Sequence, residues 1–106
     1  MDIKEFQKIS VRTMNTNLDH TAIISNCIAG IFGEGGEVAD ILKKHLYQYH
    51  PLDIEHVKEE IGDLMFYIVN LVTILNLDME DILEANINKL MERYPDGFDV
   101  TRSINR

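Results

Sequence analysis

The chain has 106 residues, of which 45% are hydrophobic and 26% are charged, and its formal net charge is −8. This composition is that of a folded globular protein and excludes a largely disordered chain. The negative charge repels nucleic-acid backbones, so nucleic acid is not an expected partner. The single cysteine, Cys27, cannot form an internal disulfide, and neither a signal peptide nor a membrane-spanning run is apparent, so we expect a cytoplasmic location. We expect one domain over residues 1–106 that self-associates, because so short a chain encloses a small core.

The first two predicted helices cover residues 2–15 and 19–48. On the first helix, Ile3, Phe6 and Ile9 are expected to face inward. The second helix carries an apolar seam at helical spacing, made of Ile24, Ile28, Ile31, Val38 and Leu42. Glycines at positions 33, 35 and 36 interrupt this seam, and we expect a kink or break there because glycine weakens a helix.

The third predicted helix begins at Asp53, a favourable N-cap just after Pro51. Its seam shows the alternating spacing of three and four that is typical of an amphipathic helix: Ile54, Val57, Ile61, Leu64, Ile68, Leu71 and Leu75. The fourth helix begins near Asp78 and ends before Pro95, and residues 95–106 are expected to form a loosely structured tail. Two long and two shorter helices with short connections predict an all-α fold, a four-helix antiparallel bundle.

Each long helix carries two acidic residues spaced three apart, Glu34 and Glu37 on the second helix, Glu60 and Asp63 on the third. Residues at this spacing share a helix face about one turn apart. Both pairs immediately precede seam positions, so two antiparallel helices could bring the four carboxylates together. Carboxylates that share one semi-buried site repel each other, and a bound cation relieves that repulsion. Oxygen ligands without sulfur or imidazole favour Mg²⁺, for which Mn²⁺ can substitute.

Two alternatives to a magnesium site are open. Acids three apart usually form a solvated helix face, in which case the chain would be a non-catalytic helical interaction module. A di-iron carboxylate bundle is disfavoured, because such sites use Glu-x-x-His pairs and no glutamate here is followed by histidine three residues later. The matching position of both acid pairs, beside glycines 35, 36 and 62, favours the metal site.

Asn86, Lys89 and Arg93 share one stripe of the fourth helix. They are candidates to grip phosphate oxygens, Arg93 through its planar fork. The alternative is a polar core residue followed by two surface cations, which are favoured near a helix C-terminus in any protein.

Three further side chains lie near the acids in sequence. Lys44 follows Glu37 by seven residues and is a weaker phosphate-binding candidate. Tyr67 follows Asp63 by four residues, and its ring could stack on a base, although such a tyrosine is more often a core residue with a wetted hydroxyl. His56 precedes Glu60 by four residues and could be a ligand, although a lone histidine is more often structural.

Three blocks of the sequence resemble, in order, those of the MazG-like, all-α nucleoside triphosphate pyrophosphohydrolase superfamily. The first is Gly-Glu-Gly-Gly-Glu-Val-Ala-Asp at 33–40, and the second is Lys-Glu-Glu-Ile-Gly-Asp-Leu-Met-Phe-Tyr at 58–67. They form an E-x-x-E pair, a 22-residue spacer and an E-x-x-D pair. The third block, at 86–95, contains the basic stripe of the fourth helix. The resemblance covers about residues 6–98.

The resemblance implies Mg²⁺ ligation by Glu34, Glu37, Glu60 and Asp63. It also implies hydrolysis of an NTP or dNTP to the monophosphate and pyrophosphate, a homodimer or homotetramer, and a role in nucleotide-pool house-cleaning. From the residues themselves, Glu37 is the candidate to assist proton removal from the attacking water, since it lies among the acids beside the glycines. A non-catalytic nucleotide-binding module of the same fold remains the alternative.

Overall fold

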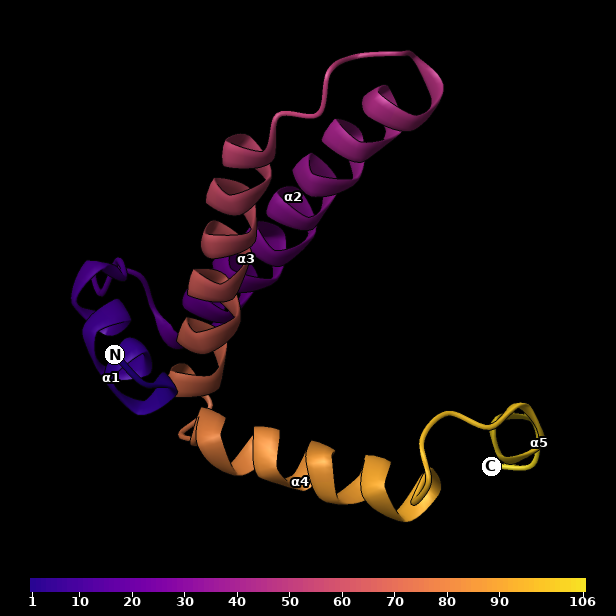
Figure 1. Cartoon of the computed structure of the whole chain (residues 1–106). Coiled ribbons are helices and arrows are strands. Elements are labelled where there is room, and N and C mark those ends of the chain that lie inside the picture. Colours follow the sequence, from indigo (N-terminus) through magenta and orange to yellow (C-terminus); the bar gives the residue numbers. More distant parts are fainter.

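The computed structural model describes all 106 residues, and every regular element in it is helical (Figure 1). In chain order the elements are α1 (Ile3–Ser10), the 3₁₀ helix η1 (Val11–Thr13), α2 (His20–Tyr47), α3 (Ile54–Ile74), α4 (Met79–Arg93) and α5 (Val100–Ile104). The predicted all-α fold is confirmed. The tail prediction is wrong in part, because α5 forms within residues 95–106.

An aspartate precedes each of the five α-helices and caps its first turn. In each case the side-chain carboxylate accepts a hydrogen bond from a backbone N–H two or three residues later; these residues are Asp2, Asp19, Asp53, Asp78 and Asp99. Such caps satisfy amide groups that have no partner inside the helix. The predicted cap at Asp53 is confirmed, and the equivalent cap at Asp99 explains why a short helix forms in the tail.

Helices α2 and α3 form a long antiparallel pair, and the loop of residues 48–53 joins them (Figure 1). The break expected at the glycines is absent, since α2 is continuous over 28 residues. Packing along α3 supplies the stability that glycine removes, because tertiary contacts rather than propensity hold most protein helices together. A Cβ atom added at Gly33, Gly35 or Gly36 would meet nothing within 4 Å, so no close packing within the chain requires these glycines.

The line along which the two helices meet follows the predicted apolar seam only in part, since Val57 is buried and Ile31 and Leu64 are half-buried. Ile28, Leu42 and Ile61 of that seam are 44%, 37% and 46% exposed. Ile23 and Cys27, each one residue before a predicted seam position, are buried instead. Glu34 and Glu60, which precede seam positions, are half-buried between the helices, and part of the apolar seam is left facing outward.

The hydrophobic core is small and lies at the end of the pair near the N-terminus. Val69, Val72 and Met79 form its buried cluster, and Ile3 and Phe6 of α1 pack against it. Ile9, also predicted to face inward, is 52% exposed. Only eight of the 106 residues are buried, so most of the apolar surface has no cover within one chain.

Helix α4 does not complete a four-helix bundle in the single chain. It turns away from α3 at 104° and packs chiefly against α1 (Figure 1). The radius of gyration is 17.0 Å, against about 13 Å for a compact chain of this length. No single helix is long and apolar enough to cross a membrane; only the bent pair of α3 and α4, taken together, meets that criterion.

The turn between α3 and α4 is fixed by the backbone itself. Asn76 has a φ of 60°, in the left-handed region that asparagine tolerates better than most residues. The N–H of Leu77 donates to the carbonyl of Val72 at 2.9 Å, and the N–H of Asn76 donates to that of Thr73 at 2.9 Å. These two bonds form a Schellman motif, which ends α3 and sends the chain off in a new direction.

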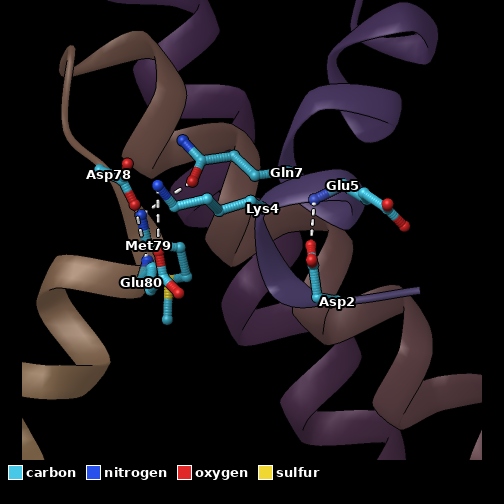
Figure 2. Close-up of polar contacts among 7 residues, drawn as sticks. All are labelled: Asp2, Lys4, Glu5, Gln7, Asp78, Met79 and Glu80. Carbon is cyan, nitrogen blue, oxygen red and sulfur yellow. Dashed lines mark hydrogen bonds and ion pairs between the residues drawn. The ribbon is translucent and has the colours of Figure 1, made fainter.

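Gln7 of α1 fastens this turn to the N-terminal helix (Figure 2). Its Nε2 donates to Thr73 Oγ1 at 3.1 Å and to the Leu77 carbonyl at 3.0 Å. Its Oε1 accepts from the backbone N–H of Met79 at 2.8 Å. One side chain thus connects α1, the end of α3 and the start of α4. Nearby, Lys4 forms an exposed ion pair with Glu80 at 3.1 Å (Figure 2).

We expect Gln7→Leu to lower the free energy of unfolding by about 1–3 kcal/mol, because it leaves the partly buried N–H of Met79 unpaired. Chemical denaturation followed by circular dichroism measures this loss. Lys4→Ala is the matched control on the same helix, and it should change stability little because exposed ion pairs contribute little. Equal effects of the two substitutions would contradict the role given to Gln7.

Candidate functional site

Three carboxylates meet between α2 and α3. Glu34 comes from the middle of α2, and Glu60 and Asp63 come from the first half of α3. One oxygen atom from each lies within 4.8 Å of the others. The antiparallel pairing thus brings together three of the four predicted acids.

The environment of this cluster favours a cation. Glu34 is half-buried, and the Glu60 side chain is only 12% exposed. A hydrogen bond between these two carboxyl groups raises the pKa of Glu34, and burial and the charge of Glu60 raise it further. Octahedral Mg²⁺ holds its oxygens at 2.0–2.1 Å, which places ligand atoms about 3–4 Å from each other. The three side chains therefore fit a magnesium ion with small adjustments, and a cation would relieve their mutual repulsion.

His56 contacts this cluster from the preceding turn of α3. Its Nε2 lies 3.3 Å from Glu60 Oε1. The sequence did not decide whether His56 is a ligand or a structural residue. In the structure its side chain contacts a carboxylate of the cluster. The spacing of four residues was the signal for this contact, since such residues are neighbours on a helix surface.

Glu37 lies outside the cluster of three. It is exposed and lines a hollow of about 320 Å³ with, among others, Asp40, Lys44 and His56. Lys44 forms an ion pair with Asp40 at 2.7 Å, and the hydrogen bond to Asp40 raises the pKa of Lys44. Sequence reasoning missed Asp40, which shares the acidic block with Glu37 and follows it at the same spacing of three.

Tyr67 is fixed within the α2–α3 contact, one turn beyond Asp63. A Cβ atom at Gly30 would lie 2.4 Å from the Tyr67 ring, so the absence of a side chain there lets the ring lie against α2. Phe66 packs edge-on to the same ring, with centroids 5.2 Å apart and planes at 79°. Gly30 was not among the residues singled out from the sequence, and only its position opposite the ring reveals its role.

The basic stripe of α4 is far from the acids of the same chain. Asp63 lies about 16 Å along α3 from the turn, and Lys89 lies about 15 Å along α4 beyond it, at 1.5 Å per residue. With the helices at 104°, the two positions are about 20 Å apart. Asn86 and Lys89 are exposed, and Arg93 is half-buried beside α5. The structure therefore does not bring this stripe to the acids within one chain.

The family model of the MazG nucleotide pyrophosphohydrolase domain matches residues 24–98. The chain belongs to this family. The chain is also similar to the Gene 37 protein of Mycobacterium phage L5, with 30% identity over 78 residues, which cover 70% of this chain and 68% of that protein. No solved structure matches the chain.

The MazG match contains both acid pairs and the whole of α3 and α4. Helix α1, η1 and the first residues of α2 lie outside it. The region that carries the cluster is thus the family region, while the Gln7 contacts join it to a segment before the match.

We expect Mg²⁺ to raise the melting temperature of the native chain, because a ligand of the native state stabilises it by mass action. Glu60→Gln and Asp63→Asn should abolish this shift without lowering the melting temperature in EDTA, since each removes a repelling charge. Differential scanning fluorimetry with and without Mg²⁺ measures both effects. Glu59→Gln is the matched control, because Glu59 is exposed and lies outside the cluster. If Glu59→Gln and Glu60→Gln behaved alike, the assignment of ligands would be wrong.

Proposed function

We propose that the chain is a Mg²⁺-dependent nucleoside triphosphate pyrophosphohydrolase that acts in nucleotide-pool house-cleaning. It would convert an NTP or dNTP and water to the monophosphate and pyrophosphate. The observation that carries this proposal is the cluster of Glu34, Glu60 and Asp63 in a chain of the MazG family. The cut at the α–β bond follows from the family, since the cluster alone does not choose between phosphorus atoms.

In this proposal each side chain has a separate task. Glu34, Glu60 and Asp63 hold the metal, and Mn²⁺ can replace Mg²⁺. When bound, the ion polarises phosphate oxygens and acidifies a water molecule. Glu37, on the next turn of α2 and outside the three-carboxylate cluster, would accept a proton from the attacking water. Lys44 lines the same hollow as Glu37. When substrate binds, its ammonium group leaves the ion pair with Asp40 and contacts a phosphate oxygen.

Hydrolysis in ¹⁸O-water tests which bond is cut. We expect the label in the nucleoside monophosphate, because the water attacks the α-phosphorus, and we expect turnover to stop in EDTA and return with Mg²⁺. Mass spectrometry of both products locates the label. Labelled pyrophosphate would mean attack at the β-phosphorus, and a diphosphate with labelled orthophosphate would refute the proposal. Tight Mg²⁺-nucleotide binding without turnover would favour the non-catalytic module of the same fold.

We also propose that the working form is a homodimer or homotetramer. The accessible surface is 7877 Å², about 1,800 Å² more than a compact monomer of this mass exposes. That excess is in the range that one protomer buries in a stable interface. Exposed apolar side chains on two helices contribute to this excess surface. Phe32 of α2 is 76% exposed, and Ile87 and Met91 of α4 are 57% and 61% exposed. A second copy could also bring its α4 stripe of Asn86, Lys89 and Arg93 to the acids.

Light scattering should give a multiple of 12.2 kDa at micromolar concentration. Phe32→Glu should shift the population toward the monomer, because it places a charge in the apolar face that the assembly would bury. Thr21→Glu adds the same charge at an exposed polar position on the same helix and should leave the mass unchanged. A single 12.2 kDa species for the native chain would contradict the proposed assembly.

A further inference from the structure

Asn70 is a buried amide with nothing to bind. It lies on α3, two turns beyond Asp63, and is 2% exposed. Neither its Oδ1 nor its Nδ2 has a hydrogen-bond partner. Buried side-chain polar atoms are nearly always paired, and each exception calls for an explanation. An amide left unpaired in this way fits a group that receives its partner from a ligand.

Asn70 lines a small cavity that offers such a ligand a place. The cavity has a volume of about 130 Å³. Its other lining residues include Thr13 and Asn15 before α2, Asn26 and Cys27 of α2, and Phe66 and Tyr67 of α3. Aromatic rings together with a few polar groups are typical of small-molecule sites. Burial raises the pKa of the Cys27 thiol, so this side chain contributes a neutral, apolar surface.

The cavity stands at a useful distance from the acid cluster. Asn70 follows Asp63 by seven residues, and Cys27 precedes Glu34 by seven, which is about 10 Å along each helix axis. Because α2 and α3 are antiparallel, both displacements run in the same direction. A nucleotide whose phosphates lay at the carboxylates could therefore extend its base into this cavity.

We propose that this cavity binds the base of a pyrimidine nucleotide and that Asn70 forms the hydrogen bonds to its edge. The inference rests on the proposed function, since it places the phosphates at the acid cluster. An asparagine side chain presents a donor and an acceptor next to each other. A pyrimidine offers the complementary pair at ring position 3 and the exocyclic group at position 4.

The size of the cavity selects one ring over two. A protein cavity of about 150 Å³ accommodates benzene, a single six-membered ring. The 130 Å³ here is on that scale, so a single ring fits this space more closely than the fused rings of a purine do. Tyr67, held against Gly30 and Phe66, supplies a fixed aromatic surface at the same place. The size of the cavity thus favours a pyrimidine, and the Asn70 amide can pair with the edge of that base.

Calorimetry with non-hydrolysable α,β-imido analogues of dCTP, dUTP, dATP and dGTP tests the proposal, with Mg²⁺ present. We expect the pyrimidine analogues to bind native protein at least tenfold more tightly than the purine analogues. Asn70→Leu should weaken pyrimidine binding at least tenfold, because two hydrogen bonds are lost. Binding of inorganic pyrophosphate should stay unchanged in this variant. Asn88→Leu, the same substitution at an exposed position of α4, should leave all affinities as they are.

The melting temperature of ligand-free Asn70→Leu provides a second readout. It should equal or exceed that of the native chain, because two unpaired polar groups give way to an apolar one of similar size. A large fall would show that Asn70 supports the fold and would overturn the assignment. Equal binding of purines and pyrimidines by native protein would overturn it without any variant. Either result would leave the proposed function standing, whereas a failure of every analogue and of pyrophosphate to bind with Mg²⁺ would count against that function itself.

Discussion

The antiparallel contact between α2 and α3 determines where every candidate group lies. It places Glu34 opposite Glu60 and Asp63, so that oxygen atoms 26 or more residues apart in the chain come within 4.8 Å of one another. It also places Gly30 opposite Tyr67, where any larger residue would meet the ring. Carboxylates on a packing line oppose association of the two helices through repulsion and desolvation. A bound cation reverses the sign of that contribution, so metal binding and helix pairing should stabilise each other.

Because carboxylates occupy part of the contact between α2 and α3, fewer apolar side chains are buried there. With Glu34, Glu60 and the Tyr67 ring between the helices, part of the apolar seam faces outward, as Ile28 and Ile61 do. The chain therefore has a small core of its own and a large apolar surface. Self-association would bury this apolar surface, and it could place the α4 helix of one copy beside the acid cluster of another. Assembly and activity are thus expected to depend on the same surfaces.

The N-terminal segment contacts both the turn between α3 and α4 and the cavity beside Asn70. Gln7 fixes the turn where α4 departs, and residues 13–15 border the cavity beside Asn70. Both lie before the part of the chain that matches the MazG family. The family region supplies the acids and the turn before α4, whereas the preceding segment fastens that turn through Gln7 and lines one side of the cavity.

The sequence by itself determined the all-α class, the start of α3 at its aspartate cap, and the two acid pairs, because caps and spacing are local properties that pairing does not change. It was wrong about a break in α2 and about the loose tail, since helix packing outweighs glycine and Asp99 caps α5. The inner face of α2 lay beyond its reach, because a shift of one residue turns a helix by 100° and its apolar residues fit more than one face. Only the tertiary structure separated Glu37 from the other three acids and left the Asn70 amide unpaired beside a cavity. Both depend on which side chains meet across helices, and spacing within one helix does not contain that information.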